Sequence, residues 1–180
     1  SEMCIRDSIM EKDKASIDDM YNDLLNLGRI FGVEEKANSL VDGYRLELSK
    51  ETKNLKSENP LRVFVYDSGE DAPFTAGLYA MPTALIEAAG GTNIMDDFKK
   101  SWGTVTWEEV IDRNPEVIVI VNYGNVTAVQ KREFMMSNPA FADLDAVKND
   151  RFVTLEYVEA TPGPRNINAV KTLLKAFWGS

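Results

Sequence analysis

The 180-residue sequence contains no histidine and only one cysteine, Cys4. Without histidine, it lacks the usual general base of a serine or cysteine triad and the commonest nitrogen ligand of metal ions. A single cysteine excludes an intramolecular disulfide and a thiolate zinc site. These absences argue against nucleophilic catalysis and against a histidine- or cysteine-ligated metal centre.

Long apolar runs and basic clusters are also missing. No stretch is long and apolar enough to cross a bilayer, and no signal peptide is visible. The 20 basic residues are outnumbered by 29 acidic ones, giving a formal charge of −9, so nucleic acid is not expected as a partner. Gly90-Gly91 lies outside any GxGxxG or GxxxxGK pattern, and no phosphate loop is indicated.

The strongest structural signal lies in residues 105–124, VTWEEVIDRNPEVIVIVNYG. Thr106 can cap a helix there, and Glu109 three positions later completes a capping box. Asn114-Pro115 ends this helix. The following VIVIV run is apolar and β-branched at every position, so we expect both faces of this strand to be covered. Such strands occur mainly in parallel sheets between helices, which predicts a layered, Rossmann-like α/β fold.

The remaining sequence predicts further elements of the same kind. One amphipathic helix runs from Ile17 to about Phe31. A second, from about Glu34 to Ser57, has a polar later half and is long enough to connect two bodies. We also predict strands at 61–66 and 152–155, helices at about 81–89, 127–136 and 166–178, and loops at 67–77 and 92–103.

The opening residues, SEMCIRDS, show no periodicity that joins them to the first helix. They resemble a translated sequencing-adapter tail, and we place residues 1–15 outside the fold. The expected organisation is therefore a helical segment at 16–58 followed by an α/β lobe at 59–180.

Aromatic residues follow the predicted strands. In open α/β sheets, ligands bind beyond the carboxyl ends of the strands. Several aromatic groups on one such edge could hold a large, partly apolar ligand, although aromatic residues can equally seal loops onto a core. The candidates at strand ends or in adjacent loops are Tyr66, Asp67, Phe74, Tyr79, Trp102, Tyr123 and Tyr157.

Four short motifs occur in a characteristic order: AGGTN at 89–93, WGTVTWE at 102–108, NPEVI at 114–118 and AVKN at 146–149. Together they resemble the C-terminal lobe of the substrate-binding proteins of ABC importers for iron-siderophores, haem and cobalamin. The resemblance runs from about Ser16 to the end and covers only the latter half of such a protein. It implies that the N-terminal lobe, the secretion signal and the lipid anchor are absent from this chain.

The resemblance implies a non-enzymatic, periplasmic or membrane-anchored extracellular protein. Such a protein holds its ligand between two lobes and delivers it to an ABC permease and its ATPase. In this family one glutamate on each lobe docks into an arginine pocket of the permease. Glu108 matches the C-lobe glutamate, and its neighbour Glu109 is easily confused with it. We expect a monomer without an intrinsic cofactor, whose ligand is a ferric siderophore or a similar metal chelate.

Ligand contacts carry over less directly. Trp102 matches a family tryptophan that often lines the cleft, and Phe74 matches a ligand-side position on the first C-lobe loop, as does the region of Tyr66. Cobalamin binders of the family have an acid and an arginine where this chain has Tyr157 and Thr161, so cobalamin is a less favoured alternative. The lack of histidine disfavours haem held by histidine, and bare zinc or manganese.

Other readings remain open at this point. Arg165 either neutralises an anionic siderophore or anchors the last helix. The chain as a whole could also be an α/β enzyme domain that has lost its catalytic half, or a sensor or adhesion module built from the same lobe.

Overall fold

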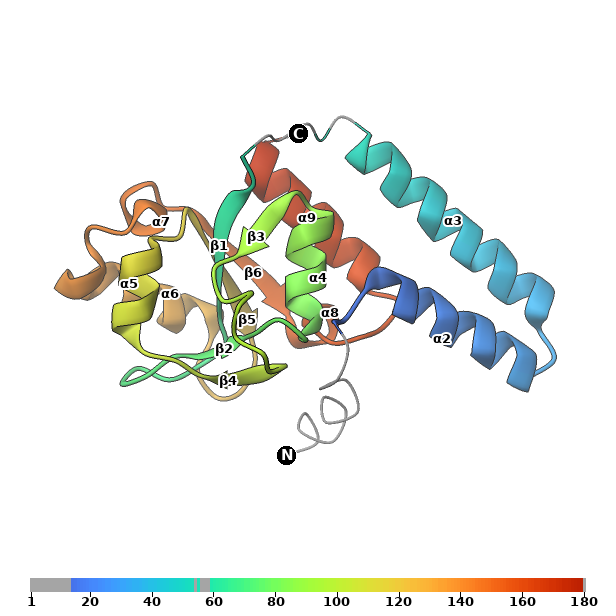
Figure 1. The fold of residues 1–180 in the computed structure, drawn as a ribbon, viewed down its shortest axis with the longest axis horizontal. Helices are drawn as coiled ribbons and strands as arrows, with labels where there is room; N and C mark the ends of the chain where they lie inside the picture. Colours follow the sequence, from blue (N-terminus) through green and yellow to red (C-terminus); the bar gives the residue numbers. More distant parts are fainter. Residues whose placement is uncertain (1–13, 54, 56–58, 180) are drawn as a thin grey trace.

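The structure is a computed structural model that describes residues 14–53, 55 and 59–179 (Figure 1). Residues 1–13, most of the predicted tail, lie outside this range. The two residues of that segment that are described pack against the fold. The Lys14 Nζ pairs with Glu87 Oε1 at 2.5 Å, and Ala15 is buried.

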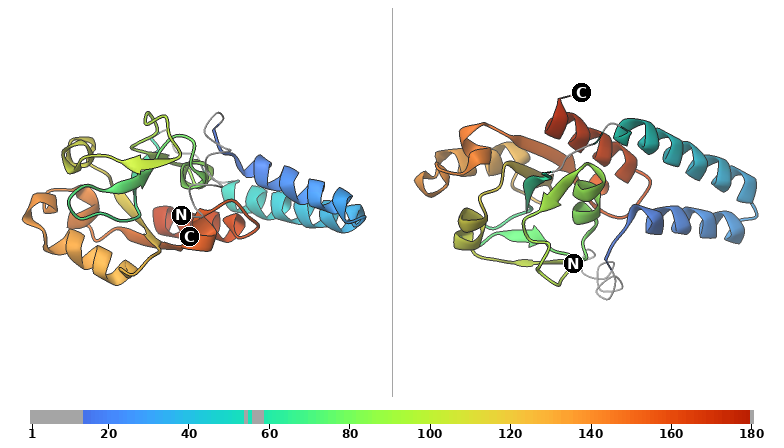
Figure 2. Two further views of the ribbon diagram at one scale, coloured as in Figure 1. Left: turned by 90° about the horizontal axis from the view of Figure 1, so that it is seen from below. Right: turned by 45° about the horizontal axis from the view of Figure 1, so that its top comes forward.

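A helical hairpin precedes the lobe and projects from its side (Figures 1 and 2). It consists of α2 (Ile17–Ile30) and α3 (Glu34–Thr52). α2 begins with a capping box in which the Ser16 hydroxyl accepts the Asp19 N–H. α3 ends at Thr52, earlier than the expected end near Ser57, and residues 54, 56 and 57 of the expected helix lie outside the described range. Within the described part of the chain, no helix is both long and apolar enough to cross a membrane.

The lobe is built on a parallel sheet. Its strands are β1 (Leu61–Tyr66), β3 (Gly91–Asn93), β5 (Val117–Asn122) and β6 (Phe152–Glu156), in the spatial order β3-β1-β5-β6. Every neighbouring pair is parallel. The predicted α/β class with a mostly parallel sheet is confirmed.

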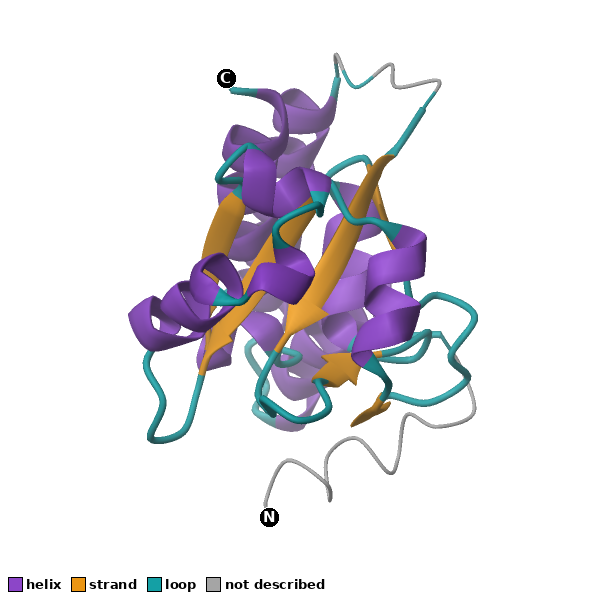
Figure 3. Cartoon of the chain, turned by 90° about the vertical axis from the view of Figure 1, so that its left-hand side faces the viewer, coloured by secondary structure: helices purple, strands orange, loops and turns teal. Residues whose placement is uncertain are grey.

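Helices cover both faces of this sheet (Figure 3). One face carries α4 (Met81–Ala88), α8 (Tyr157–Ala160) and α9 (Asn166–Trp178). The other carries α5 (Trp107–Arg113), α6 (Ala128–Ser137), the 3-10 turn η1 (Pro139–Phe141) and α7 (Asp145–Lys148). Along β5 the valines enter the first core and the isoleucines the second, which confirms that this strand is covered on both sides.

Two short strands pair antiparallel beyond the end of β1: β2 (Phe74–Ala76) and β4 (Trp102–Thr104). The sequence predicts loops at these positions and at β3, and this is wrong. Each of these strands has only three residues, too few for an alternating pattern to show. The buried amide of Asn93, at the end of β3, donates to the Ala76 carbonyl and to the Thr83 hydroxyl, both at 2.8 Å, and so joins the two-stranded β2–β4 sheet to the parallel sheet.

Candidate functional site

The parallel strands β1, β5 and β6 finish at one edge of the sheet, where Tyr66, Tyr123 and Tyr157 lie at or just beyond their ends. Tyr123 and Tyr157 stack on each other with ring centroids 4.7 Å apart. Tyr123 is 42% exposed. This stack therefore offers an aromatic surface at the carboxyl edge of the sheet.

Tyr66 is placed differently from the other two tyrosines. Its ring is buried, 5.4 Å from the ring of Trp107, and its hydroxyl donates to the Gly69 carbonyl at 3.3 Å. Burial, with the nearby Glu70 and Asp67 carboxylates, raises the pKa of Tyr66 to about 12. Side chains alternate along β1, so Tyr66 points into the same core as Phe64. Tyr66 reaches the carboxyl edge of the sheet only where it lines a cavity between the loops that follow β1 and β5.

A second aromatic pair lies on the two-stranded β2–β4 sheet. The rings of Phe74 and Trp102 stack at 6.0 Å with an interplanar angle of 11°, and both side chains are half-buried. Tyr79 is half-buried in the turn that follows β2, where its carbonyl accepts a 3.5 Å bond from the Ser101 hydroxyl. Arg165 precedes α9, is exposed, and its side chain neither pairs nor hydrogen-bonds with any described residue. Four of the six sequence-predicted aromatic residues thus form two separate stacks, whereas Tyr66 and Tyr79 lie outside both.

Trp107, which the sequence analysis does not single out, connects this edge to α5. Its indole N–H donates to the Glu70 carbonyl at 2.6 Å, and its ring packs 4.6 Å from that of Phe141 and 5.9 Å from that of Phe134. The available signal was its position directly after the cap Thr106. Trp107 therefore fixes the start of α5 beside the loop that follows β1.

The two glutamates at the start of α5 have different surroundings. Glu109 closes the capping box, because its Oε2 accepts the Thr106 N–H at 3.2 Å while its own N–H donates to the Thr106 hydroxyl at 3.2 Å. Glu108 is exposed, and its carboxylate has no hydrogen bond or ion pair with the rest of the described chain. Glu108 is therefore available to a partner, whereas Glu109 is used by the fold.

A cavity of about 270 Å³ opens between the loops that follow β1 and β5. Gly69 and Gly124, one in each loop, have φ angles of +89° and +80°, which favour glycine. A Cβ on Gly69 would also collide with the Ala72 carbonyl. The lining residues are Tyr66, Asp67, Ser68, Gly69, Glu70, Tyr123, Gly124, Asn125, Val126 and Lys131.

Two charged side chains are buried beside this cavity. Burial raises the pKa of Asp67, while the Ser68 hydroxyl and the Lys131 charge oppose the rise. Burial lowers the pKa of Lys131, and Asp67 opposes that change. Lys131 was not identified from the sequence. The signal for it is its position four residues before Met135, on the same buried face of α6.

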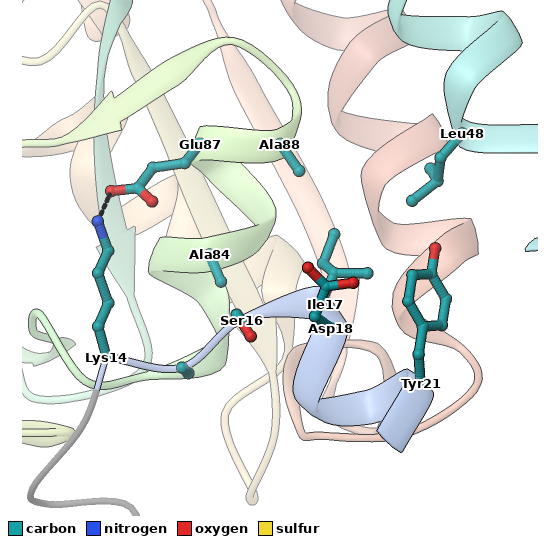
Figure 4. A pocket seen from close by; sticks show the side chains of 10 residues that line it. Lys14, Ser16, Ile17, Asp18, Tyr21, Leu48, Ala84, Glu87 and Ala88 are labelled. Carbon is teal, nitrogen blue, oxygen red and sulfur yellow. Dashed lines mark hydrogen bonds and ion pairs between the residues drawn. The ribbon is translucent and has the colours of Figure 1, made fainter. Parts of the chain in front are cut away.

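A second hollow, of about 450 Å³, lies where the helical hairpin meets the lobe (Figure 4). Figure 4 shows Lys14 reaching Glu87 of α4, with Tyr21 and Leu48 on the hairpin side. Within the described range, no group of three or more histidine, cysteine, aspartate or glutamate side chains is placed to hold a metal ion.

Residues 8–159 match the family model described as periplasmic binding protein. This chain belongs to that family, which comprises substrate-binding proteins of ABC importers. The match includes residues 8–15, which the sequence analysis assigns to the tail.

Known relatives and solved structures agree with this assignment. A periplasmic binding protein from Veillonella parvula is 34% identical and superposes with a TM-score of 0.87, over 96% of this chain and 60% of that one. An uncharacterized ABC transporter substrate-binding lipoprotein of Bacillus subtilis is 24% identical over 92% of this chain and 52% of its own length. A vitamin B12-binding protein of Yersinia pestis is 27% identical over 62% of this chain and 40% of its own length.

The chain spans about half the length of the curated relatives it matches. These relatives are substrate-binding proteins, which are not enzymes, so the expectation of a non-enzymatic function is confirmed at the level of the family.

Proposed function

We propose that this chain forms the C-terminal lobe and the connecting helices of a two-lobed substrate-binding protein, which delivers a metal chelate of the ferric siderophore type to an ABC permease. The observation that carries the proposal is the carboxyl edge of the sheet. It presents the Tyr123–Tyr157 stack, the Phe74–Trp102 stack and a cavity between its loops. Flat aromatic surfaces of this kind suit a large, partly apolar ligand.

The metal of such a ligand would arrive already chelated. The described residues offer no cluster of carboxylate or thiolate ligands for a bare ion. Contact with the organic part of a chelate, through rings and a few polar groups, needs no such cluster. Cobalamin is the second candidate, because a relative that is 27% identical over 62% of this chain is named a vitamin B12-binding protein.

The tip of the helical hairpin supports the presence of a second lobe. Four apolar side chains there are largely exposed: Leu27 at 48%, Ile30 at 73%, Phe31 at 72% and Val33 at 48%. A contiguous exposed apolar patch commonly marks a contact surface. An N-terminal lobe packed on this tip would cover the patch and supply the opposite wall of the ligand site. In the whole protein, that lobe would follow the secretion signal and the anchor that hold it outside the cytoplasmic membrane.

Glu108 is proposed as the residue of this lobe that docks on the permease. It is exposed at the start of α5, and Trp107 beside it bonds to the loop at the carboxyl edge. A carboxylate at this position would face the same direction as the ligand mouth, so docking and ligand release would occur on one side of the protein. Its charge suits an arginine pocket.

The ligand class is tested by titrating the two-lobed protein, comprising this chain and the lobe that precedes it, with ferric hydroxamate and ferric catecholate siderophores, cyanocobalamin and haemin. Tryptophan fluorescence should quench with one chelate, and Trp102→Ala should remove much of that signal. Trp178→Phe is the matched control, because Trp178 lies at the end of α9 and bonds to the Ala89 carbonyl. Binding of none of these compounds would refute the proposed ligand class.

Docking is tested by uptake in cells that carry the cognate permease. Glu108→Lys should abolish uptake while the affinity for the chelate stays unchanged, because the residue lies outside the aromatic stacks. Glu133 is also exposed and lies in the middle of α6, so Glu133→Lys should leave uptake intact. Loss of chelate affinity in Glu108→Lys would contradict a pure docking role.

A further inference from the structure

Two buried charged side chains face the cavity at the carboxyl edge, and the aromatic stacks do not account for them. Asp67 is 3% exposed and Lys131 is 2% exposed, and both line the cavity. Asp67 directly follows β1, whereas Lys131 lies near the start of α6. Among the described residues the two form no direct ion pair, although buried charges are usually paired.

Their hydrogen bonds leave one acceptor and one donor unused. The Lys131 Nζ donates to the Val121 carbonyl at 2.7 Å and to the Tyr123 carbonyl at 3.1 Å, so one of its three N–H groups remains. The Asp67 Oδ2 accepts from the Ser68 hydroxyl at 2.9 Å. The Asp67 Oδ1 is buried and has no partner, and it is the single side-chain atom of this kind in the described part of the chain. Buried polar atoms are normally satisfied, so this exception points to a missing donor.

The charges around the cavity restrict what can bind there. A carboxylate arm would meet the Asp67 charge and that of Glu70, which is on the same lining. An ammonium group would be attracted by the two carboxylates, but it would bury a further positive charge beside Lys131. A neutral group that both donates and accepts satisfies the two unused atoms without burying a third charge. A primary carboxamide does so, because its N–H can donate to the Asp67 Oδ1 while its carbonyl accepts from Lys131.

We propose that Asp67 and Lys131 form a subsite for a primary carboxamide arm of the ligand. This subsite would specify the ligand more closely, and it rests on the proposed function because it assumes that the body of the ligand lies against the carboxyl edge of the sheet. The two loops at the cavity mouth, with Gly69 and Gly124, give the arm its entry. The ligand is thereby characterised as a chelate with at least one neutral side arm that donates hydrogen bonds.

Small probes test the subsite on the 180-residue chain itself. The labelled chain is titrated with acetamide, N,N-dimethylacetamide and acetate, and NMR follows the Ser68 and Gly124 amides and the Asp67 carboxyl carbon. Acetamide should give saturable shifts. N,N-dimethylacetamide, which has no N–H, and acetate, which is an anion, should give none. Asp67→Ala should weaken acetamide binding by about tenfold or more, the loss expected for a hydrogen bond to a charged group.

Asp71→Ala is the matched control, because Asp71 is exposed in the same loop but does not line the cavity. It should bind acetamide like the parent chain. The Asp67 carboxyl carbon reports on binding in the unaltered protein, so the test does not depend on the folding of a variant. Equal shifts with N,N-dimethylacetamide, undiminished binding in Asp67→Ala, or no saturable shift with acetamide would each overturn the subsite. None of these results bears on chelate binding by the two-lobed protein, so the two proposals fail separately.

Discussion

Replacement of Lys131 by methionine tests how the cavity wall is held. The Lys131 Nζ bonds to the carbonyls of Val121 and Tyr123 at the end of β5, and methionine keeps the apolar stem but removes both donors. Each lost bond from a charged donor to a carbonyl left without its partner costs about 1–3 kcal/mol. Part of this is offset, because the buried ammonium no longer has to be desolvated. We expect a net loss of about 2–4 kcal/mol in the free energy of unfolding.

That loss corresponds to a fall in Tm of roughly 5–15 °C for a chain of this size. Urea unfolding and calorimetry measure it, and hydrogen exchange should show faster opening of residues 123–127. Lys148→Met is the control, because Lys148 makes only an exposed ion pair with Asp143 at 3.1 Å. A change in Lys131→Met no larger than that in Lys148→Met would refute the structural role assigned to this lysine.

Two further predictions concern the same edge. Burial raises the pKa of Asp67 above its ordinary value of 3.8. The ionised Asp67 carboxylate therefore destabilises the native state at neutral pH. This destabilisation is relieved when the carboxylate takes up a proton, as the pH falls through the folded-state pKa. The stability advantage of Asp67→Asn over the parent chain in urea unfolding should therefore narrow between about pH 7 and pH 4, and a constant gap would contradict the raised pKa. At α5, Thr106→Ala should lower the free energy of unfolding by about 1 kcal/mol, because the helix loses its cap. Glu108→Gln should leave the midpoint of urea unfolding unchanged. A comparable loss of stability in Glu108→Gln would show that the fold uses this carboxylate.

The elements that could be predicted from the sequence have strong local signals. The VIVIV run of β5 is apolar at every position, and the structure buries both of its faces. The predicted capping box at Thr106 marks the start of α5. Signals of this kind depend only on residues that are close in the sequence, so they can be recognised without the tertiary structure.

The parts that could not be predicted depend on contacts between distant segments. β2, β3 and β4 have three residues each and exist because longer elements position their backbone. Tyr66 follows the alternation of β1 into the same core as Phe64, whereas it was predicted to be a ligand-binding residue at the end of the strand. Asp67 and Lys131 are 64 positions apart along the chain. They line the same cavity only because α6 packs against the sheet.

We propose above that a metal chelate rests on the carboxyl edge of this lobe. Hydrogen exchange of the two-lobed protein, with and without the chelate that binds most tightly in the titration, measures this directly. We predict that the chelate slows exchange in residues 67–70 and 123–126, the loops at the cavity mouth, and leaves the end of α9 unchanged. Tight binding without added protection in either loop would show that the chelate does not bind at this edge.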